Sequence, residues 1–394
     1  MRVAVVTNLP RPYRHALFNE VARQLGADSD LIVIYCSEQS QHPRRREVQA
    51  DYGDALYTAV RASPRRLTAR GERVRSVAAG IPGILRALHL DAAVVAGFSL
   101  DAILAHLACW RHRIPVVVWS GAWPGGEQPV SPLQRQLRKH VAAHTASMVA
   151  YGTLARDYFV SLGADRANGA VAVNTVDVER FSALAEESRS SSASAAARYH
   201  LSEKNILYVG SLVERKGAPE LLEAYARMAM PAGHCTLHLV GTGSLMSELQ
   251  LRAAGLAPHK RVRFHGFLQE DEVARLAGLC DLFVCPSRRE LWGLVINEAM
   301  ACGLPVVASR LAGATPDLID DGVNGYVVDP TQPDEIAEKL ELLLADPRLA
   351  HEMGRRAALS VREKASLDRS ARGFIQGIEI ALADSGRPCR GPSC

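Results

Sequence analysis

Residues 285–309 read CPSRRELWGLVINEAMACGLPVVAS, and the fold of the chain can be worked out from this stretch outward. An apolar run that begins after Asp281 ends at Cys285, where Pro286 breaks it. A helical pattern then runs from Gly293 to Gly303, and a second apolar run follows a few residues later. The order strand, loop, helix, strand is typical of one unit of a parallel α/β sheet.

Two carboxylates lie in this stretch. Glu290 falls on the loop after the strand, where open α/β sheets bind ligands. Glu298 lies about one and a half turns into the helix, and the N–H groups of Gly293, Leu294 and Val295 form a ready anion site at its start. The acids suit hydroxyl groups and the helix start suits phosphates, and a nucleotide sugar offers both. The alternative is a pair of solvated glutamates, which is the commoner case for two acids at an arbitrary spacing.

The whole stretch resembles the donor-site signature of glycosyltransferase family 4, whose members are retaining enzymes with the GT-B fold. The likeness includes the AMACGLPVVA tail, although Trp292 stands where Phe is more usual. The resemblance implies that Glu290 contacts the donor sugar, that the amides between the two acids hold the diphosphate, and that Glu298 binds the ribose. On this basis Trp292, Gly293, Leu294 and Val295 are donor-binding candidates.

Residues 209–217, VGSLVERKG, follow the first apolar strand of the second half. Gly210, with Ser211 beside it, lets the backbone approach a ligand, and Arg215 and Lys216 place two cations at the mouth of the strand. Fixed cations stabilise the charge that develops on a departing diphosphate, so no metal is required. An Arg-Lys pair alone is more often a surface pair, but this run also resembles the family's phosphate-binding segment. Arg215, Lys216 and Glu290 are therefore the predicted catalytic residues.

Two further segments resemble donor-side elements of the family. Residues 240–243, VGTG, lack the full G-x-G-x-x-G pattern of a dinucleotide fingerprint and resemble the family's strand-end turn, which makes Gly241 a candidate. Residues 264–268, FHGFL, resemble a segment whose backbone reads the nucleotide base, which adds Phe267 and Leu268. His265 is interpreted as a structural loop residue.

The first half departs from the family pattern in two places. Residues 8–14, NLPRPYR, stand where many members have a glycine-rich loop, and residues 120–127, SGAWPGGE, contain no His after the strand 116–119. Retaining chemistry by front-face attack depends mainly on stabilisation of the leaving group, so such a mechanism survives the loss of that His. The acceptor-side candidates are Asn8, Tyr13, Arg14, Ser120 and Glu127.

At 394 residues, with 48% hydrophobic and 22% charged residues, the chain is expected to form about two soluble domains. Alternating strand-like and helix-like segments predict two Rossmann-like, doubly wound parallel sheets. The family resemblance implies that the two domains are arranged as in the GT-B fold, with an interdomain cleft. Only residues 37–76 and the serine-rich region 182–198, expected to be a flexible loop near the hinge, lack clear patterning. The predicted parts are an acceptor domain (1–175), a donor domain (176–365), a helix that crosses back to the first domain (366–385) and a disordered tail (386–394).

The charge is unevenly distributed. Residues 1–173 carry 21 Lys and Arg against 13 Asp and Glu, whereas the remainder carries 25 against 29. A basic first half favours an anionic partner such as a membrane surface, an acidic acceptor or a phosphate, with a solvated arginine-rich surface as the alternative. No nucleic-acid partner and no cofactor is predicted. The expected donor is a UDP-sugar or GDP-sugar, and the expected acceptor is a saccharide, a lipid-linked molecule or a small molecule.

Neither a metal site nor a membrane span is expected. The eight cysteines show no zinc-binding spacing, and the acid-x-acid run Asp28-Ser-Asp30 is interpreted as a polar turn. The N-terminus leads directly into a strand with no signal peptide, and Asp101 and His106 interrupt the apolar region 92–110. The prediction is a cytoplasmic protein with peripheral contact at the inner face of the membrane.

The sequence and the family resemblance together thus predict a metal-independent hexosyltransferase. The resemblance implies a retaining mechanism and, with the basic first half, favours cell-surface polysaccharide or glycolipid biosynthesis as the first choice of pathway. Three alternatives remain open: a glycosyltransferase for a small-molecule natural product, a GT-B nucleotide-sugar epimerase, and an inactive nucleotide-sugar-binding subunit. The missing His motivates the last of these.

Overall fold

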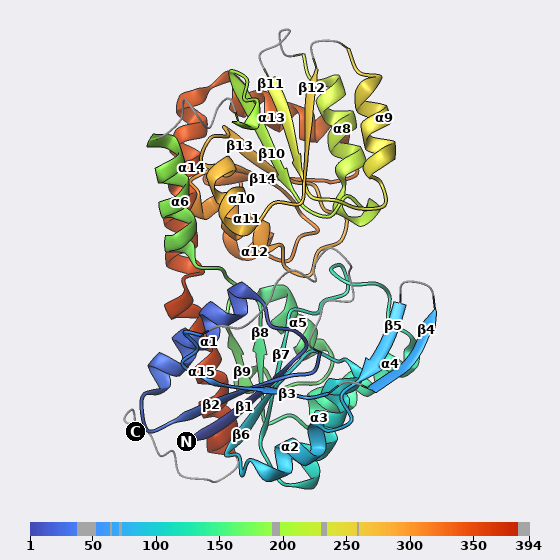
Figure 1. The fold of residues 1–394 in the computed structure, drawn as a ribbon, viewed down its shortest axis with the longest axis vertical. Coiled ribbons are helices and arrows are strands. Elements are labelled where there is room, and N and C mark those ends of the chain that lie inside the picture. The colour runs from blue at the N-terminus through green and yellow to red at the C-terminus, as the bar shows by residue number, and fades with distance from the viewer. Residues whose placement is uncertain are drawn as a thin grey trace. The chain divides into compact units, whose positions relative to one another are not determined.

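The computed structural model describes residues 1–37, 53–63, 65–70, 73–190, 198–229, 235–257 and 260–384. The chain divides into two compact units (Figure 1). The first unit contains residues 1–122, 129–174 and the chain from Leu367 onward, and the second contains residues 123–128 and 175–366. Residues 191–197 of the predicted serine-rich loop and all of the predicted disordered tail (386–394) lie outside the described residues. The prediction of a flexible loop is wrong for residues 182–190, which form the later turns of a helix (Val178–Ser190) and bury Ala185 and Ser188.

The first unit is built on a seven-stranded parallel sheet with the order β3-β2-β1-β6-β7-β8-β9. Its strands read as near-continuous apolar runs because helices cover both faces of the sheet. The strands are β1 (Arg2–Thr7), β2 (Asp30–Tyr35), β3 (Thr58–Arg61), β6 (Ala92–Ala96), β7 (Val116–Ser120), β8 (Ser147–Ala150) and β9 (Gly169–Val171).

In the part of the chain that the structure describes, the helices that accompany this sheet are α1 (Pro12–Leu25), α2 (Ile81–Ala87), α3 (Leu100–Arg111), α4 (Pro132–Ala143), α5 (Thr153–Ser161) and α15 (Leu367–Asp384). On one face α1 and the C-terminal helix α15 pack together, and the rings of Trp119 and Phe374 meet edge to face at 5.2 Å. The opposite face is covered by α2 and α3, with Ile81, Leu85 and Cys109 fully buried. The last predicted helix therefore belongs to the core of the first unit.

The segment 37–76, for which the sequence predicts no regular structure, contains more than expected. Besides β3 it includes an antiparallel hairpin of β4 (Arg65–Arg70) and β5 (Arg73–Val77). The sequence prediction missed this hairpin because neither strand shows a long apolar or alternating run.

The second unit is built on a six-stranded parallel sheet with the order β12-β11-β10-β13-β14-β15. The strands are β10 (Lys204–Val209), β11 (Cys235–Val240), β12 (Arg261–Gly266), β13 (Leu282–Cys285), β14 (Val306–Ser309) and β15 (Gly325–Val328). The helices are α6 (Val178–Ser190), α8 (Ala218–Arg227), α9 (Met246–Ala254), α10 (Glu270–Ala277), α11 (Leu294–Ala301), α12 (Thr315–Leu318), α13 (Pro333–Ala345) and α14 (Pro347–Lys364). Two doubly wound parallel sheets were the predicted fold class, and this prediction is confirmed.

The strand order of the second sheet creates a switch point. From β10 the chain moves to β11 and β12 on one side, and it then crosses to β13, β14 and β15 on the other side. Ligands of open α/β sheets bind outside the carboxyl ends of the strands at such a point. The loops that follow β10, β11 and β13 meet at this carboxyl edge.

Within the described residues, none of the helices has the length and apolarity needed to cross a bilayer.

Candidate functional site

A close backbone approach and backbone hydrogen bonds hold the loops after β10 and β13 together at the switch point. Gly217 has φ +72°, and a Cβ atom there would lie 1.9 Å from the carbonyl oxygen of Pro286. The Arg215 carbonyl accepts hydrogen bonds from the N–H groups of Arg288 (2.9 Å) and Arg289 (3.2 Å). Only glycine allows this approach, and the approach sets the two predicted cations beside the loop that carries Glu290.

A second tie between these loops was not foreseen from the sequence. The guanidinium of Arg288 forms an ion pair with Glu220 at the start of α8, at 3.2 Å, and lies 3.7 Å from Glu214. The two consecutive arginines before Glu290 are visible in the sequence, but the acidic partners of Arg288 become apparent only in the folded structure.

Lys216 and Glu290 form a partly buried ion pair between Nζ and Oε2. Their side chains are 16% and 13% exposed, respectively. Arg215 differs, because its side chain is exposed and has no hydrogen bond or ion pair with any described residue. One predicted phosphate-binding cation is therefore held by the predicted sugar-binding acid, and the other points into solvent at the mouth of β10.

Glu298 lies on α11, and the residue as a whole is half-buried. Burial raises the pKa of its carboxyl to about 8, with Glu270 adding to the rise and Lys216 opposing it. No hydrogen bond from its side chain to the described residues is found. A carboxyl that is largely neutral near pH 7 can both donate to and accept from the hydroxyl groups of a sugar.

The start of α11 lies next to Glu290. Gly293 caps the helix with φ +100°, and a Cβ atom there would lie 3.3 Å from the Glu290 Cγ. The N–H of Ile296 bonds to the Gly293 carbonyl at 2.8 Å. Within the described chain, the N–H groups of Leu294 and Val295 have no acceptor, so they remain available to an anion.

The loops after β10 and β11 also approach closely through glycine. Gly241 has φ +128°, and a Cβ atom there would lie 1.9 Å from the Gly210 carbonyl oxygen. The Gly210 N–H donates to Val240 (2.9 Å), and the adjacent Ser211 carbonyl accepts from the Tyr208 hydroxyl (3.3 Å). The backbone at 210 and 241 thus forms a surface without side chains next to Arg215.

The loop after β12 continues this surface. Gly266 accepts a hydrogen bond from the Gly241 N–H at 2.6 Å. Phe267 follows with its side chain 48% exposed, and Leu268 is half-buried. The structure therefore brings these two predicted base-reading residues to the same edge as the phosphate-binding candidates.

His265 is held by structural partners. Its ring stacks on that of His238, with centroids 5.2 Å apart and Nε2 3.0 Å from the His238 Nδ1. The buried His238 contacts the Asn205 Oδ1 at 3.1 Å through its other nitrogen. Burial lowers the pKa of both rings, to about 3 for His238. These contacts agree with the interpretation of His265 as a structural residue.

The Trp292 side chain points inward. It is 3% exposed, and its Nε1 donates to the Asn297 Oδ1 at 3.0 Å. Its carbonyl accepts from the Ala314 N–H at 2.9 Å. Trp292 therefore anchors the first turn of α11, and its predicted contribution to donor binding would act through that anchoring.

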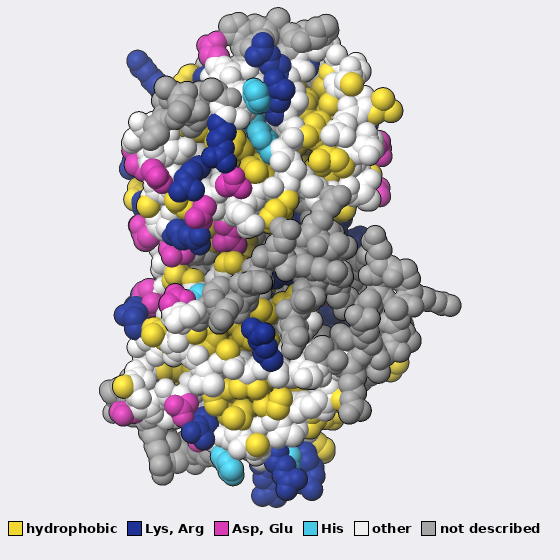
Figure 2. Space-filling view, in the orientation of Figure 1, with side chains coloured by type: hydrophobic (Ala, Val, Ile, Leu, Met, Phe, Trp, Pro, Cys, Tyr) yellow, Lys and Arg dark blue, Asp and Glu magenta, His cyan; other side chains and the backbone are white. Residues whose placement is uncertain are grey.

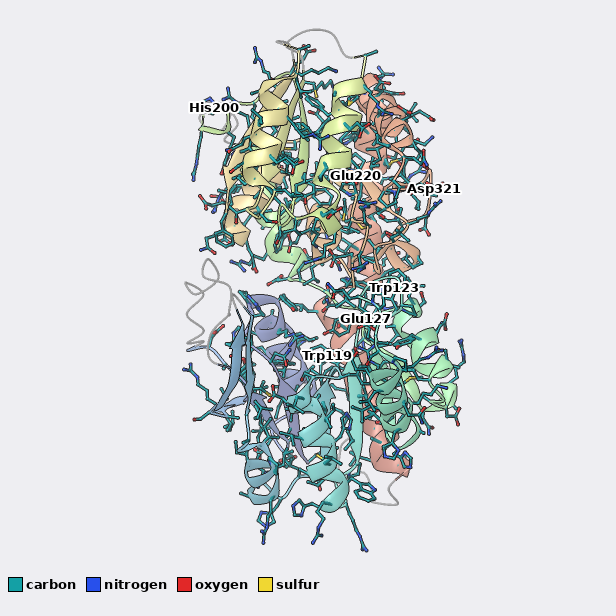
Figure 3. All side chains as sticks on the ribbon, turned by 90° about the vertical axis from the view of Figure 1, so that its right-hand side faces the viewer. Trp119, Trp123, Glu127, His200, Glu220 and Asp321 are labelled. Carbon is teal, nitrogen blue, oxygen red and sulfur yellow. The ribbon has the colours of Figure 1, made fainter. Side chains whose placement is uncertain are left out.

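The short loop Trp123–Gln128, which follows β7 in the sequence, is part of the second unit. The Trp123 Nε1 donates to the Leu291 carbonyl at 3.2 Å. At Gly126 a Cβ atom would lie 2.3 Å from that nitrogen and 2.9 Å from the Glu290 carbonyl oxygen. Glu127, an acceptor-side candidate, lies near Trp123 on this loop (Figure 3). Trp123 was missed, although the paired glycines that follow Pro124 could have indicated a loop wrapped around a ring.

Arg14 has internal partners in the first unit. Its guanidinium donates to the Thr7 hydroxyl and to the Tyr151 hydroxyl, the latter at 3.2 Å. It also lies over the Trp119 ring, 5.0 Å from the centroid, and Tyr13 contributes a second, more distant ring at 5.9 Å. Arg14, in the first turn of α1, thus contacts the carboxyl end of β1 through Thr7 and the residue after β8 through Tyr151.

Of the remaining acceptor-side candidates, Asn8 and Ser120 lie at the carboxyl ends of β1 and β7, and Tyr13 lies in the first turn of α1. Ser120 is buried, and its hydroxyl accepts from the Ala122 N–H at 3.1 Å. Tyr13 is half-buried and Asn8 is exposed. Because β6 alone separates β1 from β7, these residues belong to one edge of the first sheet.

No metal centre is found in the part of the chain that the structure describes, where no three His, Cys, Asp or Glu side chains are grouped to hold an ion. In the Asp28-Ser-Asp30 turn, Asp30 begins β2 and pairs with Arg2 at 2.9 Å.

Comparison with protein families matches residues 194–360 to the family described as glycosyl transferases group 1. All the donor-side candidates, from Gly210 to Glu298, fall within the matched segment.

Two curated proteins illustrate the similarity. The chain is 30% identical to alpha-D-kanosaminyltransferase of Streptomyces kanamyceticus over 268 residues, which is 65% of this chain and 66% of that protein. It is 36% identical over 165 residues to the GDP-mannose-dependent alpha-(1-6)-phosphatidylinositol monomannoside mannosyltransferase of Mycolicibacterium smegmatis, which is 40% of this chain and 43% of that protein. The matches therefore span from about two fifths to just under two thirds of these relatives.

Solved structures extend the similarity to nearly the whole chain. The Anabaena protein HepE, crystallised with UDP and glucose, superposes with a TM-score of 0.75 at 18% identity and covers 96% of this chain and 99% of its own. Sucrose-phosphate synthase of Thermosynechococcus elongatus gives a TM-score of 0.71 at 18% identity, with 97% and 99% coverage. The chain has the GT-B fold, as the sequence predicts.

Proposed function

We propose that this protein is a retaining glycosyltransferase of family 4, which transfers a sugar from a nucleotide diphosphate to an acceptor hydroxyl. One observation carries the proposal: Arg215, Lys216, Glu290 and the free N–H groups at the start of α11 converge on the switch point of the second sheet. The family match over residues 194–360 and the transferases among its relatives support it.

The cations and the helix start would act on the leaving group. When the bond between the sugar carbon and the phosphate oxygen breaks, negative charge accumulates on the diphosphate. Arg215, Lys216 and the N–H groups of Leu294 and Val295 would stabilise this charge with preorganised donors, which is the largest contribution expected from such a site. Lys216 would then exchange its contact with Glu290 for one with phosphate.

The two acids would orient the rest of the donor. Glu290, at the rim of the site, would accept a hydrogen bond from a sugar hydroxyl, and Glu298, deeper on α11, would bind the ribose hydroxyls. The acceptor hydroxyl would attack the face from which the diphosphate leaves, and its proton would pass to the departing phosphate oxygen. This route requires no His in residues 120–127 and retains the anomeric configuration.

We propose a UDP-sugar or GDP-sugar as the donor and a saccharide or lipid-linked hydroxyl as the acceptor, in cell-surface polysaccharide or glycolipid assembly in the cytoplasm. HepE was crystallised with UDP, whereas the name of the mycobacterial relative specifies GDP-mannose. Both bases therefore stay in the proposal.

The proposal is tested first by donor binding. A panel of UDP-, GDP- and ADP-sugars is screened by thermal shift, since a bound donor raises the melting temperature by mass action. The stabilising donor is then incubated with a panel of sugar acceptors and followed by NMR. Arg215→Ala should lower turnover about 10²–10³-fold, whereas Arg348→Ala, on the exposed surface of α14, should leave it unchanged.

The alternative functions predict different results in this NMR assay. An epimerised donor in the absence of acceptor would assign an epimerase. Donor binding with neither transfer nor hydrolysis would assign a binding subunit. A product with the inverted anomeric configuration would reject the retaining mechanism, and full activity in Arg215→Ala would reject the phosphate assignment.

A further inference from the structure

Two helices of the first unit leave large apolar side chains in water. On α3, Leu107 is 55% exposed and Trp110 is 74% exposed. On α4, Leu133 is 79% exposed and Leu137 is 36% exposed. The spacings of three and four residues align each pair on one side of its helix. We call this surface, together with the cations described below, the α3–α4 face.

A cavity of about 440 Å³ opens between the two helices. Leu107, Trp110 and Leu137 line it, together with His106. The His106 Nε2 is buried and has no hydrogen-bond partner within the described chain, and burial lowers the pKa of this ring to about 4. His106 is therefore neutral near pH 7, and the apolar side chains of the face surround a recess that is open to an apolar group.

Cations flank the apolar side chains of α3. Arg111 comes four residues after Leu107, on the same side of the helix, and Arg113 follows the end of the helix. Both are exposed and form no ion pair with any described residue. On α4, Arg135 and Lys139 each come two residues after an exposed leucine, so they lie on the other side of that helix. The acids of residues 100–146 are Asp101, which accepts from the Ala78 N–H at the other end of α3, and Glu127, which belongs to the second unit. Figure 2 shows Lys and Arg side chains gathered at the end of the first unit where α2 and α3 lie. The face therefore combines exposed apolar groups with uncompensated positive charge.

We propose that the α3–α4 face docks on an anionic phospholipid bilayer. Trp and Leu side chains enter the boundary between headgroups and acyl chains, and Arg and Lys remain level with the lipid phosphates. Self-association through this face is disfavoured, since two copies would bring the same cations together. The proposal is independent of the transfer reaction.

Flotation of the full chain with vesicles tests the proposal. Phosphatidylcholine vesicles are compared with vesicles that contain about one third phosphatidylglycerol, at roughly 0.05 M and 0.5 M salt. The protein should float with the anionic vesicles at low salt, much less at high salt, and not with phosphatidylcholine alone.

Variants separate the two contributions. Trp110→Ser should weaken partitioning about ten-fold or more, and the double variant R111Q/R113Q should weaken it about thirty-fold. The controls are Leu251→Ser, at a 76% exposed leucine on α9, and R355Q/R356Q, which makes the same change in net charge on α14. Both controls should bind like the unaltered protein.

Several outcomes would overturn the proposal. These are no binding of the unaltered chain to anionic vesicles, or unchanged binding of both Trp110→Ser and R111Q/R113Q. A concentration-dependent dimer that Trp110→Ser abolishes would assign the face to a second copy, and retention on immobilised polyglutamate without vesicle binding would assign it to an acidic protein. The thermal shift with donor should persist in Trp110→Ser, which shows that the variant is folded and keeps this test separate from that of the transferase.

Discussion

At the scale of single residues, Glu298 affects both the stability of the fold and the proposed binding of the donor. Its folded-state pKa of about 8 lies above the ordinary value of 4.5 because the carboxyl is buried. A carboxyl with a raised pKa stabilises the fold while it is neutral. That stability is fully present below about pH 4.5 and is lost as the pH rises through about 8. Alkaline conditions therefore place an unfavourable charge at this position.

We predict that Glu298→Gln has opposite effects on stability and on binding. The amide keeps the shape of the side chain but does not titrate. The free energy of unfolding of the variant, relative to that of the unaltered protein, should therefore rise between pH 5 and pH 9 by an amount on the order of a few kcal/mol. Donor binding should weaken, because both ribose hydroxyls can donate to the two oxygens of an ionised carboxylate, whereas the amide has a single acceptor oxygen. Urea unfolding at both pH values and calorimetry with the donor measure the two effects. The control is Glu248→Gln on the exposed side of α9, and an equal pH dependence in both proteins would contradict the prediction.

The Lys216–Glu290 pair makes a second residue-scale prediction. Since both side chains are largely buried, removal of either partner leaves a desolvated charge, and Lys216→Met and Glu290→Gln should each cost about 1–3 kcal/mol. The double variant should cost clearly less than the sum. Lys216→Met should also lose affinity for UDP or GDP itself, whereas Glu290→Gln should lose only the preference for the sugar-bearing form. Additive stabilities, or equal losses for the free nucleotide, would argue against the assigned roles.

At the scale of elements, features that depend on one continuous stretch of sequence could be predicted. Features without an apolar pattern, or that join distant residues, could not. Runs such as Val3–Val6 and Val116–Trp119 identified strands because a strand buried on both faces is apolar throughout. The start of α11 and its neighbouring acid were predictable because they adjoin in the sequence. The β4–β5 hairpin and the contact of Trp123 with Leu291 were not, since the first lacks an apolar pattern and the second joins residues far apart in the sequence.

The glycine contact between the loops after β10 and β13 is the element-scale feature most open to test. Gly217→Ala would meet the Pro286 carbonyl as well as the cost of a positive φ, so we expect a loss on the order of 2–4 kcal/mol together with weaker donor binding. Gly303→Ala is a matched control, because Gly303 has φ +79° with open space around it and should cost about 1 kcal/mol. Denaturant unfolding compares the two variants. Equal losses would show that the contact with Pro286 does not hold the loops.

At the scale of the whole molecule, the two units carry different chemistry. At the carboxyl edge of the second sheet, the cations, the acids and the glycine backbone all come from residues 194–360. Because they fall within this one segment, they could be proposed as a site from the sequence. Of the acceptor-side candidates, Asn8 and Ser120 come from the ends of β1 and β7, Tyr13 and Arg14 from the first turn of α1, and Glu127 from a loop of the second unit. Arg14 and Ser120 already have partners inside the first unit. Which acceptor-side candidates are already engaged in hydrogen bonds can be seen only in the folded chain.

This division predicts two separate patterns of hydrogen exchange. A nucleoside diphosphate should slow exchange in the loops after β10, β11 and β13 and at the start of α11, because it orders those loops and engages their N–H groups, and should leave α3 and α4 unchanged. Anionic vesicles without nucleotide should slow exchange in α3 and α4 and leave those loops unchanged. Gly217→Ala should lose the first pattern and Trp110→Ser the second. Nucleotide protection confined to the first unit would reject the donor site, whereas vesicle protection confined to the second unit would reject the α3–α4 face alone.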